Sequence, residues 1–144
     1  MIKNNMIFKK LRVGFTLTEI LIVVIIVGIL ATLALPMLVK TLEKAKVGEA
    51  VSNLNLIRTG QKIYFLEYGQ FSPDIASLNI ENPNLASSRY FYYEPIAVAD
   101  LTRDFKAQAT RGGSGAVSAP SPYQGDQYYI QNDGTVHGRF ATNP

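Results

Sequence analysis

The chain has 144 residues, of which 47% are hydrophobic and 17% are charged, and its formal net charge is +3. This length allows one modest domain, and the lack of cysteine excludes disulfide bonds within the chain. The first 14 residues contain four of the 14 basic residues and none of the 11 acidic ones, so the rest of the chain has a net charge of −1. A strongly basic nucleic-acid-binding surface is therefore not expected there.

The N-terminal segment places its signals in an unusual order. A secretory signal peptide has a basic region, an apolar core and then a small-residue cleavage site. Here a basic leader reaches Gly14 before the apolar run begins. Cleavage after Gly14 would remove the leader, residues 1–14, and keep the apolar segment. An ordinary signal-peptidase cut near Thr32–Ala34 would instead discard that segment.

The apolar run carries one carboxylate near its start. Residues 20–39 contain no charge and are long enough, at roughly 20 residues, to cross a bilayer as a helix. A charge within such a helix costs about 2.5–3.5 kcal/mol, so Glu19 needs a partner. The candidate partner is the amine created at Phe15 by cleavage. The alternative is that Glu19 lies at the lipid interface of an uncleaved anchor and is neutralised by a raised pKa.

This N-terminal motif resembles that of the type IV pilin and pseudopilin family over about residues 13–39. The resemblance implies cleavage between Gly14 and Phe15 by prepilin peptidase, N-methylation of Phe15, and pairing of its amine with Glu19 of a neighbouring subunit during assembly. Many pilins close a C-terminal loop with a disulfide, which this chain cannot form. The resemblance rests on Gly14, Phe15, Thr16, Leu17, Glu19 and Pro36.

Helical periodicity continues beyond the apolar run. We predict one helix in two parts, an apolar membrane and assembly part over 15–39 and an amphipathic part over 40–66. Pro36 predicts a kink or local melting near 32–36. Gly28 either adds flexibility or lets neighbouring helices approach closely. The predicted apolar side contains Leu38, Leu42, Ala45, Ala50, Val51, Leu54, Ile57 and Tyr64; the predicted polar side contains Lys40, Glu43, Lys44, Lys46, Glu49, Ser52, Asn55, Arg58 and Lys62.

Residues 67–144 predict a globular β head. Strands are expected at 89–94, 104–110, 128–131 and 135–137, with Asp133-Gly134 favouring a tight hairpin turn between the last two. Four glycines, three serines and two prolines predict a flexible loop over 111–127. The expected fold class is α+β, a long N-terminal helix packed on a small antiparallel sheet of three or four strands.

The head shows no pattern typical of an enzyme or a cofactor site. Asp100, Asp104, Asp126 and Asp133 match no calcium loop and are interpreted as turn residues, and the lone His137 has no catalytic partners in the sequence. The aromatic residues 90–93 and 128–129 favour a sheet core and subunit contacts. A stacking platform for single-stranded nucleic acid and a ligand or cytochrome contact are the less favoured alternatives. The platform would use Arg89, Arg103, Lys106, Arg111 and Arg139.

The combined hypothesis is a structural subunit of a type IV pilus-like helical filament. As the resemblance implies, it would enter the inner membrane as a precursor, meet the prepilin peptidase, and be polymerised by an assembly ATPase and a platform protein into an extracellular homo-oligomer. One alternative is a type II secretion pseudopilin of a short periplasmic pseudopilus. Outside the family, the alternative is a single-pass, membrane-anchored binding domain that never polymerises.

Overall fold

The computed structural model describes residues 14–141, so nearly all of the predicted leader, residues 1–13, lies outside the described part. Within these residues, the α-helix α1 (Leu17–Tyr68) is followed by two short 3-10 helices and four strands. Residue contacts divide the chain into two units, one up to Val39 and one from Lys40 onward. We describe each unit by itself.

The first unit consists of the N-terminal part of α1. All residues from 14 to 38 are exposed, because nothing in this unit packs against the apolar side chains. The helix continues through Pro36, so local melting at this proline is not seen. Proline has no backbone N–H, and the carbonyl of Thr32, four residues earlier, therefore receives no intrahelical hydrogen bond from it.

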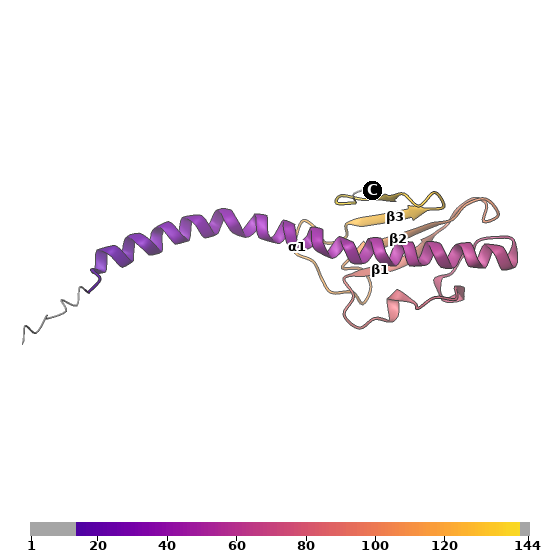
Figure 1. Ribbon diagram of the computed structural model, residues 1–144, viewed down its shortest axis with the longest axis horizontal. Helices are drawn as coiled ribbons and strands as arrows, with labels where there is room; N and C mark the ends of the chain where they lie inside the picture. The colour runs from indigo at the N-terminus through magenta and orange to yellow at the C-terminus, as the bar shows by residue number, and fades with distance from the viewer. Residues whose placement is uncertain (1–13, 142–144) are drawn as a thin grey trace, which may run out of the picture. The chain divides into compact units, whose positions relative to one another are not determined.

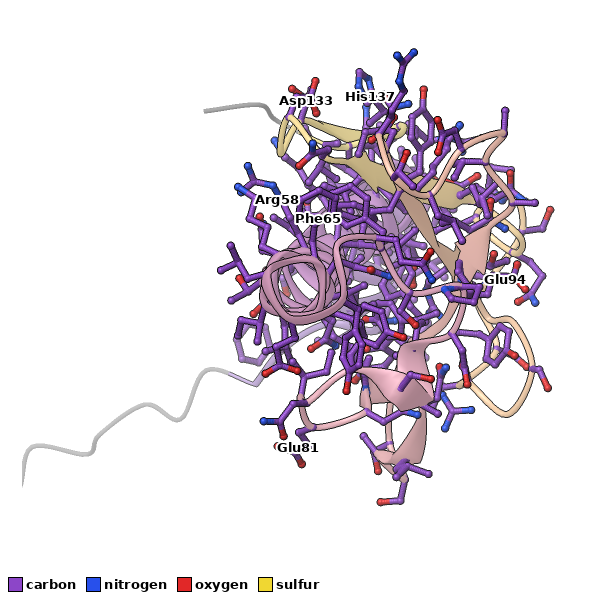
Figure 2. All side chains as sticks on the ribbon, turned by 90° about the vertical axis from the view of Figure 1, so that its right-hand side faces the viewer. Arg58, Phe65, Glu81, Glu94, Asp133 and His137 are labelled. Atoms are coloured by element: carbon purple, nitrogen blue, oxygen red, sulfur yellow. The ribbon has the colours of Figure 1, made fainter. Side chains whose placement is uncertain are left out.

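The second unit contains an antiparallel sheet with the strand order β1-β2-β3-β4. The strands are β1 (Phe91–Ile96), β2 (Lys106–Arg111), β3 (Gln127–Gln131) and β4 (Val136–His137). In Figure 1, the C-terminal part of α1 lies across this sheet. Figure 2, which looks along the helix, shows α1 on one side of the sheet and Glu94 projecting on the other. The register pairs Tyr93 with Ala109, Ala109 with Tyr128, and Ile130 with Val136.

The core lies between α1 and the inner face of the sheet. Alternate residues of β2 are buried, as the period of a strand with one covered face requires. Phe91 and Tyr128 meet edge to face, with ring centroids 5.7 Å apart. Side chains of α1, the connection and the sheet together form the buried apolar cluster: Val47, Ala50, Leu54, Ile57, Phe71, Ile75, Leu78, Phe91, Tyr93, Phe105, Ala107, Ala109, Tyr128, Ile130 and Val136.

The segment between α1 and β1 is fastened by side chains. Gly69 adopts φ +72°, and its N–H bonds the Phe65 carbonyl at 2.8 Å, which ends α1 in the way that glycine favours. Buried Gln61 bonds both the carbonyl and the N–H of Ser72, at 2.9 and 2.7 Å. Two short 3-10 helices follow, η1 (Ile75–Ser77) and η2 (Pro83–Leu85).

The outer edge of β1 is occupied by one amide side chain. Asn84 Nδ2 donates to the Tyr93 carbonyl at 2.7 Å, and the Tyr93 N–H donates to Asn84 Oδ1 at 2.9 Å. The amide thus takes the place of a neighbouring strand at this residue. Two residues further on, Pro95 has no N–H to offer.

The β3–β4 hairpin forms where the sequence predicts it. Gly134 has φ +91°, and its N–H bonds the Gln131 carbonyl at 3.0 Å. Arg58 of α1 reaches the same turn and donates to the carbonyls of Asn132 and Asp133 at 3.1 and 3.3 Å. The turn is therefore held both by its own backbone and by the helix.

The structure corrects the predicted faces of α1. Leu38, Leu42 and Ala45 are exposed, whereas Glu43, which we placed on the polar side, is 3% exposed. The buried stripe begins at Glu43 and continues through Val47, because the sheet covers that side of the helix. The strands start later than the predicted ranges in β1 and β2, while the fold class is as predicted.

Candidate assembly site

The first turn of α1 is closed by Thr16 and Glu19. The Thr16 N–H and hydroxyl donate to Glu19 Oε2 at 2.8 and 2.9 Å, and the Glu19 N–H donates to Thr16 Oγ1 at 3.2 Å. This reciprocal pattern is a capping box, in which an N-cap threonine and a glutamate three residues later satisfy each other's backbone donors. Glu19 therefore has a local partner that the sequence interpretation overlooked.

The signal for that partner was present in the sequence as Thr-x-x-Glu ahead of an apolar run. The carboxylate also lies at the N-terminal end of α1, where the helix dipole favours negative charge. Both hydrogen bonds from Thr16 end on Oε2, which leaves Oε1 for a further donor. Glu19 can therefore cap the helix through Oε2 and pair with a cation through Oε1.

Gly14 and Phe15 precede the helix and are both exposed. A Cβ built at Gly14 would meet nothing within 4 Å, and the Phe15 side chain is 84% exposed. The peptide between them is thus uncovered by the described residues. The predicted pairing joins the Phe15 amine of one subunit to Glu19 of another, and it stays a prediction.

Gly28, which was predicted with Pro36 to make the helix flexible, lies in the apolar part of α1. A Cβ at Gly28 would also meet nothing within 4 Å, and Thr32 Oγ1 donates to the Ile29 carbonyl at 2.7 Å. In the described part of the chain, α1 is the one helix long and apolar enough, by length and composition, to cross a membrane. Its large apolar side chains between residues 20 and 38 are each more than half exposed.

A buried ion pair joins α1 to the sheet at the start of the second unit. Arg111 Nε and Nη2 lie 2.8 and 3.2 Å from the two carboxylate oxygens of Glu43, and the two side chains are 2% and 4% exposed. Lys46 Nζ adds a second cation 2.7 Å from Glu43 Oε1. Arg111 also donates to the carbonyls of Tyr90, Val117 and Ser118, so it fastens the loop after β2 to the helix.

The cations Arg111 and Lys46 keep the Glu43 carboxylate charged. Burial raises the pKa of Glu43, but the hydrogen bonds and charges of Arg111 and Lys46 outweigh it and hold that pKa below its ordinary value of 4.5. Burial likewise raises the pKa of the Tyr128 phenol, to about 12. Glu43 is therefore a charged and Tyr128 an uncharged member of the core at neutral pH.

The other predicted groups are not brought together as binding sites. Arg111 is buried and fully engaged, so it cannot join a nucleic-acid platform with the exposed Arg103. Phe91, Tyr93 and Tyr128 belong to the core, as the favoured interpretation of the aromatic residues expects. Asp100, Asp104 and Asp133 accept hydrogen bonds from turn backbones, and no group of three or more His, Asp or Glu among the described residues could hold a metal ion.

Comparisons with known proteins agree with the N-terminal motif. No family model matches the chain. It is 36% identical over 98 residues to the type II secretion system core protein G of Aeromonas hydrophila, an alignment that covers 67% of this chain and 68% of the relative. The chain belongs to the type IV pilin and type II secretion pseudopilin family.

Both branches of the pilin and pseudopilin family appear among the relatives. The chain is 46% identical over 87 residues to the type IV major pilin protein PilA of Myxococcus xanthus, covering 60% of this chain and 39% of that pilin. A major pilin PilE1 of Neisseria gonorrhoeae is 39% identical over 77 residues, covering 51% and 44%. The chain thus spans less than half the length of these pilins, and the match to core protein G extends over a larger share of the relative.

Proposed function

We propose that this pilin-family chain is a structural subunit of a type IV pilus-like helical filament. Prepilin peptidase cuts between Gly14 and Phe15, and Phe15 is then N-methylated. The helices of residues 15–39 pack together as the filament core. The observation that carries this proposal is an apolar helix that no other residue among 14–141 covers, headed by a carboxylate, in a chain related to pilins and pseudopilins.

The energetics of the first unit support this proposal. Exposed apolar surface contributes roughly 25 cal/mol per Å² when it leaves water, so some twenty uncovered residues require lipid or other helices. The inner membrane supplies that environment for the precursor, and neighbouring subunits supply it in the filament. Glu19 then sets the register, because a buried charge left without its partner is strongly unfavourable.

A second function within the family is supported by a separate observation. The match to core protein G covers two thirds of that relative, whereas each pilin is matched over less than half. A pseudopilin would use the same cleavage and helix packing but form a short periplasmic pseudopilus. In either case, the proposed partners are the peptidase, an assembly ATPase, a platform protein and further copies of the chain.

Pro36 and Gly28 are proposed to give the core helix its local flexibility. Proline removes one hydrogen bond from the ladder and a glycine adds backbone freedom, so the segment near residue 32 is the weakest part of the helix. Replacing Pro36 with alanine supplies an N–H for the Thr32 carbonyl. Filament images should then show a straighter, more regular helix here, and unaltered geometry would mean that proline is not the cause.

The intact mass and N-terminal sequence of the membrane-extracted chain test the function. They are measured from cells with and without the matching peptidase, and filaments are located by electron microscopy. A start at methylated Phe15, found only with the peptidase, supports the filament pathway, and long extracellular or short periplasmic filaments separate pilus from pseudopilus. A chain that keeps its leader in the presence of the peptidase would point to the non-polymerising membrane anchor.

A further inference from the structure

The η2 turn presents a leucine to solvent. The Leu85 side chain is 82% exposed, although it lies between a buried Pro83 and the β1 strand. Isolated exposed leucines are common on protein surfaces and carry no meaning by themselves. Leu85 differs because the turn that holds it has little freedom to move.

That rigidity comes from both sides of the turn. Asn84 is clamped to the backbone of Tyr93, and the Leu85 N–H bonds the Asn82 carbonyl at 3.0 Å. Asn82 in turn accepts the Asn84 N–H at 3.0 Å, which caps η2. An apolar side chain on a preorganised turn loses little entropy when it is buried, so Leu85 is suited to act as a contact residue.

An apolar groove of 320 Å³ lies near the C-terminal end of α1. Its apolar part comes from Phe65, Leu66 and Phe71, and the Leu66 side chain is 85% exposed. Both charged residues that line the groove are cationic, namely Lys62 and Arg103. We call this feature the α1 groove.

The charges beside Leu85 have the opposite sign to those of the α1 groove. Glu81 lies four residues before Leu85, is exposed, and forms no ion pair among residues 14–141. Lys62 is equally unpaired within that range, and Arg103, 85% exposed, has a long 3.7 Å contact with Asp100. The two surfaces therefore match in their apolar centres and complement each other in their charged rims.

A single copy of the chain does not join these two surfaces. In Figure 2, Glu81 lies below the end-on helix and Phe65 lies above it, so separate sides of the head carry them. Two different complementary patches on one molecule produce a head-to-tail contact, which builds an open helical assembly or a ring. Such a contact suits a filament subunit.

We propose that Leu85 of one subunit docks into the α1 groove of a second copy, with Glu81 facing Lys62 and Arg103. The inference rests on the proposed filament function and adds a contact between heads to the packing of the N-terminal helices. The contact is heterologous, so every subunit uses its η2 turn toward one neighbour and its α1 groove toward another.

Cysteine cross-linking of the full chain tests this contact, since the chain has no native cysteine. Leu85→Cys and Leu66→Cys are combined in one chain, expressed with the assembly machinery, and treated with a short bismaleimide, which tolerates more geometry than a disulfide. Both positions are more than four-fifths exposed, so the fold is expected to survive, and thermal unfolding checks this. Each single-cysteine chain is the matched control.

The expected result is a ladder of covalent multimers from filaments of the double variant and monomers from both single variants. Filaments that form normally but give only monomers would overturn the head contact and leave the filament function intact. A chain that is neither processed nor assembled, with or without cysteines, contradicts the filament function, and this inference is then overturned with it.

Charge exchange provides a second readout in the same assay. Glu81→Lys alone and Lys62→Glu alone should each reduce the ladder several-fold, and the double exchange should restore it. Lys44→Glu reverses another exposed lysine of α1 outside the groove and should leave the ladder unchanged. Equal loss from Lys44→Glu, or no recovery in the double exchange, would contradict the proposed pairing.

Discussion

Arg111 donates to both carboxylate oxygens of Glu43 across 68 residues of sequence, and both side chains are almost completely buried. The pair joins β2 to the beginning of the packed part of α1. Because Arg111 also donates to three backbone carbonyls, one guanidinium connects the helix, the residue just before β1 and the loop after β2. The stability of the head should therefore depend on it strongly.

Arg111→Met should destabilise the chain by about 3–5 kcal/mol, because it leaves the Glu43 carboxylate buried without its main partner. Urea unfolding of the full chain in detergent measures the change. Arg103→Met is the matched control, since its guanidinium is exposed, and should stay within about 0.5 kcal/mol. The double variant Glu43→Leu with Arg111→Met should lose less than Arg111→Met alone. Similar small losses for Arg111→Met and Arg103→Met would contradict the importance of the pair.

The Glu43–Arg111 pair also predicts that the free energy of unfolding depends on pH in the acidic range. The pKa of Glu43 in the folded chain lies below 4.5, its ordinary value, so the folded state favours the charged form. Its contribution is complete above about pH 4.5 and is lost as the pH falls through the lowered pKa. The difference in unfolding free energy between the wild type and Glu43→Gln, measured from pH 7 to pH 3, should shrink in that acidic range. A difference that stays constant with pH would mean that Glu43 does not titrate in this way.

Two substitutions at Glu19 separate its cap from its charge. Glutamine can still accept the Thr16 hydrogen bonds in a capping box, but it cannot pair with an amine as a charge. We expect Glu19→Gln and Glu19→Ala to be inserted and cleaved alike and both to give few filaments. Immunoblots of membrane and sheared-filament fractions measure this. Normal filament yield from Glu19→Gln would assign the residue to capping alone.

Two glycines of α1 offer a matched pair for testing the packing. A Cβ at Gly60 would lie 2.8 Å from Ile80 Cγ2 and 3.3 Å from Leu78 Cβ, whereas a Cβ at Gly48 would meet nothing within 4 Å. Gly60→Ala should therefore destabilise by roughly 1–3 kcal/mol through overpacking. Gly48→Ala should stabilise by about 0.5–1 kcal/mol, because alanine favours the helix. Thermal unfolding measures both changes. A stabilising Gly60→Ala would contradict the prediction and show that Leu78 and Ile80 move aside at little cost.

The sequence predicted the features that depend on neighbouring residues. The long helix, a small antiparallel sheet of three or four strands and a hairpin turn at Asp133-Gly134 follow from local periodicity and turn chemistry, and the structure confirms them with four strands. The prediction that Glu43 lies on the polar face of α1 was wrong. Hydrophobic periodicity treats every carboxylate as an exposed polar group, even one that is buried against a cation. Arg111, the partner, is remote in sequence, and only the folded sheet brings it to the helix. The Thr16–Glu19 cap is local, and the pattern Thr-x-x-Glu ahead of an apolar run is sufficient to predict it.

The Asn84 clamp on β1 bears on how copies of this chain can lie close together without aggregating. An uncovered strand edge invites any other strand to add to it, and such pairing grows into tightly bound aggregates. Here the Asn84 amide bonds both the N–H and the carbonyl of Tyr93, and Pro95, two residues further along the same edge, has no N–H to donate. The other edge of the sheet is β4, which is only two residues long. Copies of this chain can therefore lie close together with little tendency to pair strand to strand. Contacts between them are then made by side chains, and such contacts are reversible.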